Sequence, residues 1–192
     1  NVHPEHAGAD YSLVDLNRAG TPLLEIVTAP DMRSVDEAEA FMQTLRQMLL
    51  YCGVSDCKMQ EGSLRFEASI SLRPAGSDED APRVEIKNLN SIRAVVGALQ
   101  YERERQEKVL EEGGEVARET RLWDEAAERT ARMRSKELAQ DYRYFPDPDL
   151  VPYEVTDEQL EEIASEVPEL PLERKRRFCS EYGLSEYDAD VL

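Results

Sequence analysis

Charged and polar residues alternate with apolar residues in a stretch near the middle of the chain, where they could hold an anionic substrate and a metal ion. Over residues 64–73, arginine, glutamate and serine occupy every second position, which is the two-residue period of a β-strand with one face in a core. Residues 83–87 repeat the pattern, place Lys87 on the polar side and continue into Asn88 and Asn90. If the two strands pair, their polar sides form one surface of mixed charge. An ordinary sheet with one face in water has the same pattern, so both interpretations stay open.

Glu25 lies inside an otherwise apolar run, residues 23–27. A buried carboxylate is costly unless it is paired, hydrogen-bonded or bound to a metal ion. The same run also fits an edge strand on which Glu25 is exposed, and the sequence leaves the two interpretations equal. We predict short strands at 13–18 and 23–27, with a turn over residues 19–22 between them.

Three other features have both a functional and a structural interpretation. His3 and His6 could be metal ligands or simply part of a polar loop. Residues 141–150 are aromatic and acidic with two prolines, which fits either a pocket wall that carries Asp141 and Arg143 or a well-packed rigid linker. The basic cluster at 174–177 could touch nucleic acid or form a solvated helix face.

Capping signals predict the helices that flank the two strands. Residues 34–37 form a capping box that opens a helix reaching about Tyr51. Asn90 or Ser91 should cap a second helix over residues 92–112. Its second half, residues 101–108, is rich in charge, and we predict a solvated face there.

The later part of the chain predicts a hairpin and then a group of helices. The hairpin arms are residues 115–124 and 129–134. Thr156 should cap the first helix, Pro171 should open the second and Gly183 close it, and Ser185 should begin the third. A change in composition places a domain boundary near residue 152, which separates residues 1–152 from the start of an all-helical domain at 153–192. The predicted fold class is α+β, with a mostly antiparallel sheet and packed helices.

Composition limits the classes of function. The chain has 192 residues, a net charge of −18 and 41% hydrophobic residues, which is enough apolar content for a core. This acidity disfavours general nucleic-acid binding by the chain itself, because phosphate neutralisation needs lysine and arginine. No apolar run is long enough to span a membrane. Three irregularly spaced cysteines fit neither a disulfide framework nor a zinc site, so we expect a cytoplasmic protein, and the absence of a starting Met suggests a segment of something longer.

Six motifs, in family order, resemble those of the B subunit of the bacterial aspartyl/glutamyl-tRNA amidotransferase. They cover nearly the whole chain, which makes the resemblance specific. The motifs are residues 15–27 (DLNRAGTPLLEIV), 61–65 (EGSLR), 84–91 (VEIKNLNS), 119–121 (ETR), 133–137 (MRSKE) and 141–146 (DYRYFP).

The resemblance implies the central part of a catalytic cradle similar in fold to glutamine synthetase. The enzyme would amidate Glu-tRNA(Gln), and in some organisms Asp-tRNA(Asn), by using ATP and Mg²⁺ to phosphorylate the side-chain carboxylate of the tRNA-borne amino acid. Ammonia from a glutaminase A subunit would then displace the phosphate, and a small C subunit would clamp the pair. Misacylated tRNA would bind mainly through C-terminal domains that this chain lacks.

The resemblance also implies roles for individual residues. After Arg65, Phe-Glu-Ala-Ser replaces the family's usual Cys-Asp-Ala-Asn, so the carboxylate at position 67 lies one methylene further out. The remaining metal ligands should precede residue 1, so the two histidines inherit no ligand role. We expect Glu25 to bind Mg²⁺, with Arg65, Glu67 and Lys87 as catalytic residues and Arg18, Asn88 and Asn90 as ATP-binding residues.

Two other classes of function stay open. The chain could be a non-catalytic scaffold segment that binds the glutaminase, with the metal site wholly in the missing N-terminal part. It could also be a nucleotide-binding enzyme unrelated to tRNA, although the sequence has no glycine-rich lysine motif of the P-loop type. The chain by itself should be inactive, because most of the expected metal ligands are absent from it.

Overall fold

The computed structural model divides the chain into two compact units, residues 1–31 and 32–192, and each is described by itself. Within the described residues, no helix is both long and apolar enough to cross a lipid bilayer. The structure describes residues 2–3, 13–14, 16–17, 19–77, 81–133 and 148–192.

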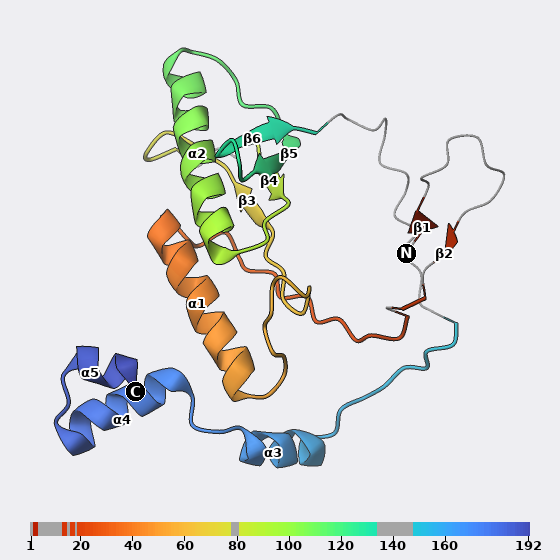
Figure 1. Ribbon diagram of the computed structural model, residues 1–192, viewed down its shortest axis with the longest axis vertical. Coiled ribbons are helices and arrows are strands. Elements are labelled where there is room, and N and C mark those ends of the chain that lie inside the picture. Colours follow the sequence, from red (N-terminus) through yellow and green to blue (C-terminus); the bar gives the residue numbers. More distant parts are fainter. Residues whose placement is uncertain (1, 4–12, 15, 18, 78–80, 134–147) are drawn as a thin grey trace. The chain divides into compact units, whose positions relative to one another are not determined.

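The first unit contains one short antiparallel pair, formed by β1 (Val2–His3) and β2 (Leu13–Val14) (Figure 1). The predicted strand over residues 23–27 is wrong, because this run is irregular coil. Leu23 is 90% exposed and Val27 is 82% exposed. A strand needs a partner for its backbone NH and CO groups, and β2 pairs with β1 instead.

The second unit contains a mixed sheet in the order β3 (Ala68–Ile70), β4 (Val84–Lys87), β5 (Glu119–Asp124) and β6 (Arg129–Arg132). The β3/β4 and β5/β6 pairs are antiparallel, and the β4/β5 pair is parallel. A parallel pair needs a crossover connection, which the helix between β4 and β5 supplies. The α+β fold class and the β5/β6 hairpin are confirmed.

The long strand predicted over residues 64–73 is only partly formed, because regular pairing is limited to β3. The predicted alternation nevertheless extends over the whole stretch. Its apolar residues, from Leu64 to Leu72, are half-buried, and its polar residues, from Arg65 to Arg73, are exposed. Side-chain burial therefore follows the two-residue period beyond the paired strand.

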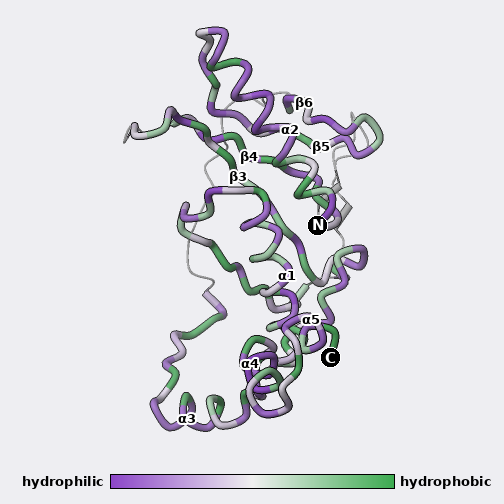
Figure 2. Tube along the Cα trace, turned by 90° about the vertical axis from the view of Figure 1, so that its left-hand side faces the viewer, coloured by the Kyte–Doolittle hydropathy of each residue, from purple (hydrophilic) through white to green (hydrophobic). Residues whose placement is uncertain are grey.

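Two long helices begin at the predicted capping residues. In α1 (Val35–Tyr51), the Ser34 hydroxyl accepts a hydrogen bond from the Glu37 NH at 3.1 Å. The Glu37 carboxylate in turn accepts a hydrogen bond from the Arg33 backbone NH at 2.5 Å. In α2 (Ile92–Glu111), the Ser91 hydroxyl accepts the Ala94 NH at 3.0 Å. The C-terminal half of α2 is mainly hydrophilic, as the purple tube in Figure 2 shows.

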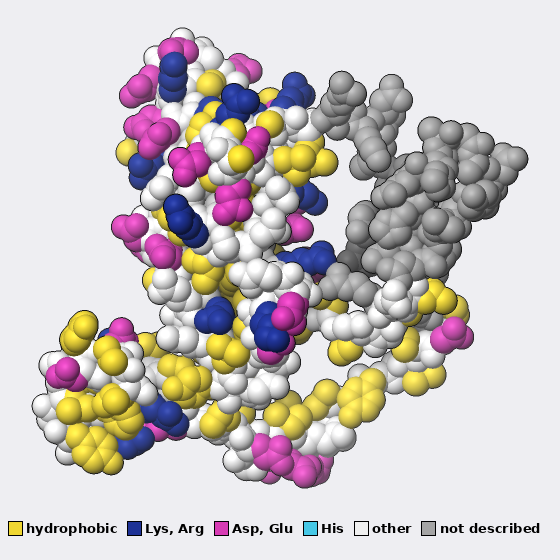
Figure 3. Space-filling view, in the orientation of Figure 1, with side chains coloured by type: hydrophobic (Ala, Val, Ile, Leu, Met, Phe, Trp, Pro, Cys, Tyr) yellow, Lys and Arg dark blue, Asp and Glu magenta, His cyan; other side chains and the backbone are white. Residues whose placement is uncertain are grey.

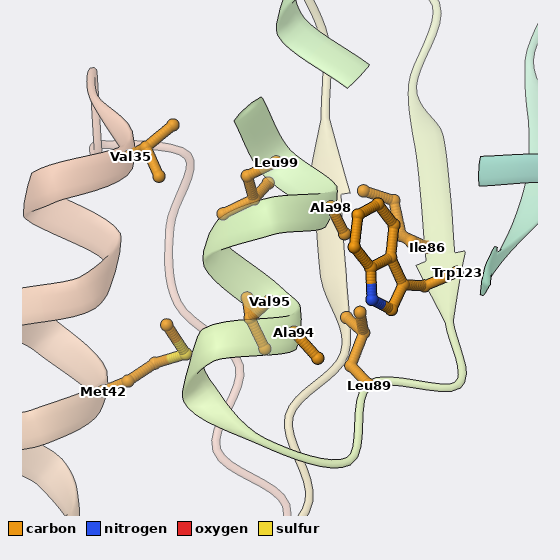
Figure 4. Close-up of a cluster of buried hydrophobic side chains, with 9 residues drawn as sticks. All are labelled: Val35, Met42, Ile86, Leu89, Ala94, Val95, Ala98, Leu99 and Trp123. Carbon is orange, nitrogen blue, oxygen red and sulfur yellow. The ribbon is translucent and has the colours of Figure 1, made fainter. Parts of the chain in front are cut away.

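The core of the second unit lies between the helices and one face of the sheet. Figure 4 shows α2 between α1 and the strands, with Trp123 of β5 against the N-terminal half of α2. Gly97 permits this close approach, because a Cβ there would lie 3.1 Å from Trp123 Cζ2. The buried residues of this cluster are Val35, Met42, Ile86, Leu89, Ala94, Val95, Ala98, Leu99 and Trp123.

The C-terminal segment contains three shorter helices, as predicted. Thr156 and Gln159 form a capping box at α3 (Asp157–Glu166). Pro171 begins α4 (Pro171–Tyr182), Gly183 ends it in the left-handed conformation, and Ser185 caps α5 (Glu186–Val191). Apolar side chains gather on the visible surface of α4 and α5 (Figure 3). The domain boundary near residue 152 stays a prediction.

Candidate functional site

The two sides of β4 face different environments. Val84 and Ile86 are fully buried on the side of α2, whereas Glu85 and Lys87 lie on the opposite side and are about two fifths exposed, at 38% and 42% of their side chains. Pairing of β4 with β3 and β5 aligns further residues with this second side. We call it the outer face of the sheet, formed by Glu67, Ser69, Glu85, Lys87, Thr120 and Leu122.

A chain of polar contacts crosses the outer face from β5 to β4. The Thr120 hydroxyl donates to Glu85 Oε2 at 3.2 Å. Glu85 Oε1 lies 3.4 Å from Lys87 Nζ. Glu85 and Thr120 are directly opposite each other in the parallel β4/β5 pair, so the carboxylate connects the lysine to the neighbouring strand.

The other two predicted catalytic residues precede β3 and are exposed. The β3/β4 pairing begins with Ala68 opposite Ile86, and Glu67 directly precedes Ala68 on the exposed side of the stretch. Arg65 lies two residues earlier on the same side of the alternating stretch. Arg65 and Glu67 are thus exposed on the polar side of the stretch that leads into β3.

Asn88 and Asn90, predicted to bind ATP, follow the end of β4. Asn88 has a positive φ of 66°, a conformation that asparagine tolerates better than most residues. Its Nδ2 donates to the Trp123 carbonyl oxygen at 2.9 Å. Asn90 Nδ2 donates to Asn88 Oδ1 at 3.4 Å. This arrangement fixes the backbone directly after Lys87, and contact of either amide with ATP stays a prediction.

Glu25, the residue predicted to bind the metal ion, belongs to the first unit. Glu25 is exposed in the irregular coil, not buried among its apolar neighbours. Arg18 and His6 lie outside the described residues, and so does most of the aromatic segment 141–150. In the part of the chain that the structure describes, no cluster of three or more His, Cys, Asp or Glu side chains could hold a metal ion.

Sequence reasoning missed a buried polar network centred on Glu102 in the second half of α2. Glu102 and Gln106 are fully buried. The Glu102 carboxylate accepts hydrogen bonds from Arg105 Nη2 at 2.8 Å and Gln106 Nε2 at 3.2 Å, and from the Thr130 hydroxyl. Arg121 Nε lies 2.9 Å from it. The predicted solvated face is therefore wrong at these two positions.

The burial of Glu102 and Gln106 could have been predicted from their spacing along α2. Val95 and Leu99 are buried, and Glu102 and Gln106 continue their stripe at intervals of three and four residues, which is the period of one helix face. The charge of residues 101–108 hid this face, because buried carboxylates are rare unless they are paired.

The partners of Glu102 decide its charge. Burial opposes the charged form, but hydrogen bonds from Arg105, Thr130 and Gln106 outweigh it, so the pKa of the Glu102 carboxyl lies below its ordinary value. The hydrogen bond to Glu102 also raises the pKa of Arg105. Glu119 completes the network, with Oε1 2.7 Å from Arg121 Nη1. Two carboxylates and two guanidinium groups thus hold β5 and β6 against α2.

Most of the basic cluster on α4 is paired with carboxylates. Arg177 Nε lies 2.6 Å from Glu169 Oε1, and this contact lowers the pKa of the Glu169 carboxyl. Lys175 Nζ lies 2.9 Å from Asp190 Oδ1. Arg174 stacks over the Tyr51 ring at 5.1 Å from its centroid. These contacts favour a structural role over nucleic-acid binding.

A family model described as the GatB/GatE catalytic domain matches residues 1–161. The chain belongs to this family. It is 57% identical over 187 residues to the B subunit of aspartyl/glutamyl-tRNA(Asn/Gln) amidotransferase from Thermoanaerobacter sp. (strain X514), a match that covers 97% of this chain and 39% of the relative. The same subunit from Caldicellulosiruptor saccharolyticus is 59% identical over 181 residues, which cover 94% of this chain and 38% of the relative. This family member therefore spans about two fifths of the length of the curated relatives it matches.

Proposed function

We propose that this chain is the central part of an amidotransferase B subunit that uses ATP to activate the side-chain carboxylate of an amino acid carried on tRNA. The carboxylate is converted to an acyl phosphate, and ammonia displaces the phosphate to form the amide. Glu-tRNA(Gln), Asp-tRNA(Asn) or both are the substrates. The names and the identity of the relatives support this reaction.

The observation that carries the proposal is the outer face of the sheet. Attack of a carboxylate on ATP brings two anions together, so cationic side chains must offset the negative charge of the transferred phosphoryl group. Lys87 projects from β4 on this face, and Arg65 is exposed on the polar side of the stretch that leads into β3. In this proposal their charges attract and orient the phosphate oxygens.

When bound, Mg²⁺ would supply positive charge that offsets the negative charge of the phosphate groups. Glu25 is exposed and has the oxygen donors that Mg²⁺ prefers. A single carboxylate does not make a metal site, and the described residues contain no larger cluster. In this proposal Glu25 supplies one ligand, and the remaining ligands come from elsewhere in the assembled enzyme.

The proposal includes the partners that this reaction needs. A glutaminase A subunit supplies ammonia, a small C subunit clamps the pair, and the tRNA binds mainly through domains outside this chain. The enzyme is a carbon–nitrogen ligase that acts in protein biosynthesis in the cytoplasm.

The test is ATP-dependent amidation of misacylated tRNA by the assembled enzyme carrying Glu25→Gln or Lys87→Ala. Both variants should lose amidation while glutamine hydrolysis and subunit assembly persist. Lys108→Ala is a matched control, because Lys108 lies on α2 with its side chain 75% exposed, and it should amidate like the parent. Unchanged amidation in both variants would refute the roles proposed for these residues.

A scaffold that binds the glutaminase is the second candidate. The exposed apolar run at 23–27 favours it, because such a run is suited to contact with another protein. Thermal unfolding of the assembled enzyme with and without ATP and Mg²⁺ separates the two functions. A ligand-dependent rise in melting temperature that Glu25→Gln removes supports the catalytic function, and a rise that Glu25→Gln leaves unchanged favours the scaffold.

A further inference from the structure

The contacts around Lys87 suggest roles for two residues beyond those already assigned. Lysine carries its charge on a flexible four-carbon stem, so an ammonium that must meet a phosphate group benefits from a fixed position. On the outer face, Lys87 Nζ lies 3.4 Å from Glu85 Oε1. The Thr120 hydroxyl donates a hydrogen bond to the other carboxylate oxygen, Glu85 Oε2, at 3.2 Å. The three side chains thus form a continuous line from β5 to the lysine.

We propose that Thr120 and Glu85 are positioning residues that hold the Lys87 ammonium where it meets the phosphate of ATP. This inference rests on the proposed function. Glu85 supplies the opposite charge, and the Thr120 hydroxyl fixes the rotation of that carboxylate so that Oε1 faces Lys87. Threonine suits the task because its β-branched side chain is stiff at χ1.

The backbone beneath these side chains is held firmly. Glu85 and Thr120 are direct partners in the β4/β5 pair. On the inner side of β5, the neighbours of Thr120 take part in the buried network, in which Arg121 Nε lies 2.9 Å from Glu102 Oε1. Asn88, the residue after Lys87, donates a hydrogen bond from its Nδ2 to the Trp123 carbonyl oxygen at 2.9 Å. The line of contacts therefore starts from a rigid strand.

Thr120→Val removes the hydroxyl and keeps the shape and the β-branch. In the assembled enzyme, equilibrium dialysis with ATP and Mg²⁺ should show affinity about twofold to fivefold weaker, the range expected for the loss of one partly exposed hydrogen bond. Thr120→Ser keeps the hydroxyl and should restore the parent affinity. Ser71→Ala is the control, because it removes an exposed hydroxyl from the stretch that follows β3, and it should change nothing.

A second readout does not depend on ATP. The ¹H–¹⁵N signal of the Lys87 ammonium, assigned by its loss in Lys87→Ala, should shift in Thr120→Val and in Glu85→Gln but not in Ser71→Ala. A merely structural role would instead lower the unfolding midpoint and leave this signal in place. An unshifted signal in Thr120→Val would overturn the inference.

A double-mutant cycle separates failure of this inference from failure of the proposed function. Thr120→Val should weaken ATP binding in the parent and have no further effect in a Lys87→Ala background. Equal weakening in both backgrounds shows that Thr120 does not act through Lys87 and overturns the inference. If Lys87→Ala itself leaves ATP binding and amidation unchanged, the proposed role of the lysine fails and the inference fails with it.

Discussion

Replacing Glu102 with glutamine removes one charge from the buried network and keeps the size of the side chain. Arg105 and Arg121 then lose the carboxylate that faces them at 2.8 Å and 2.9 Å. Removing one partner of a buried ion pair costs about 3–5 kcal/mol. Glu119 still pairs with Arg121 at 2.7 Å, and the new amide keeps one acceptor oxygen, so we expect the lower end, about 3 kcal/mol.

Urea unfolding followed by tryptophan fluorescence measures this loss. Trp123 is the chain's one tryptophan and is 5% exposed between β5 and α2, so its emission reports the packing that the network supports. A loss of about 3 kcal/mol should lower the urea midpoint by about 1–3 M, given slopes of about 1–3 kcal/mol/M. Glu104→Gln, an exposed position on the same helix, should stay within about 0.5 kcal/mol of the parent. A Glu102→Gln variant as stable as Glu104→Gln would refute the reasoning.

The same pair of proteins gives a pH dependence with a definite sign. The pKa of Glu102 is lowered in the folded chain. Its contribution to the free energy of unfolding is therefore complete above the pKa of glutamate in the unfolded chain, about 4.3. It is lost as pH falls through the folded value. The stability difference between the parent and Glu102→Gln should therefore be largest near neutral pH and shrink in acid. A difference that grows in acid would contradict this assignment.

Three further substitutions test local features of the fold. Asn88→Ala should lower the free energy of unfolding in urea by about 1–3 kcal/mol, because it loses the hydrogen bond to the Trp123 carbonyl and places alanine at a φ of 66°. Asn88→Gly should lower it by less, because glycine adopts a positive φ freely. A larger loss in Asn88→Gly than in Asn88→Ala would contradict this. Gly97→Val should cost about 1–3 kcal/mol by overpacking against Trp123, with a change in its emission; an unaltered spectrum and midpoint would contradict the close packing. Thr156→Ala should weaken the first turn of α3 by about 1 kcal/mol, seen as faster amide exchange there; unchanged exchange would contradict the capping role.

Local signals in the sequence predicted the helices well, because a cap acts within one turn. Ser34 and Ser91 accept the hydrogen bonds expected of capping residues, and Thr156 forms a full capping box. The alternation of residues 64–73 likewise predicted which side chains are exposed. Both signals depend on neighbours in the chain, which a sequence contains directly.

Pairing between distant segments was harder to predict. The apolar run at 23–27 has strand composition, but its structure depends on a partner strand that composition does not specify. Glu102 shows the opposite error, because its charge suggested solvent while Arg121 and Thr130, far along the chain, stabilise it in the core. Of the predicted site residues, Lys87 lies on the outer face with Glu85 and Thr120, and Glu25 belongs to the other compact unit.

The most direct test of the central claim is equilibrium dialysis of ATP with Mg²⁺ against the assembled enzyme, comparing the parent with Lys87→Ala. The account predicts binding about tenfold to a hundredfold weaker, the loss expected when one charge-assisted hydrogen bond to phosphate is removed. Lys108→Ala should bind like the parent. Equal ATP affinity in Lys87→Ala and the parent would contradict the claim that the outer face of this sheet binds the phosphate groups.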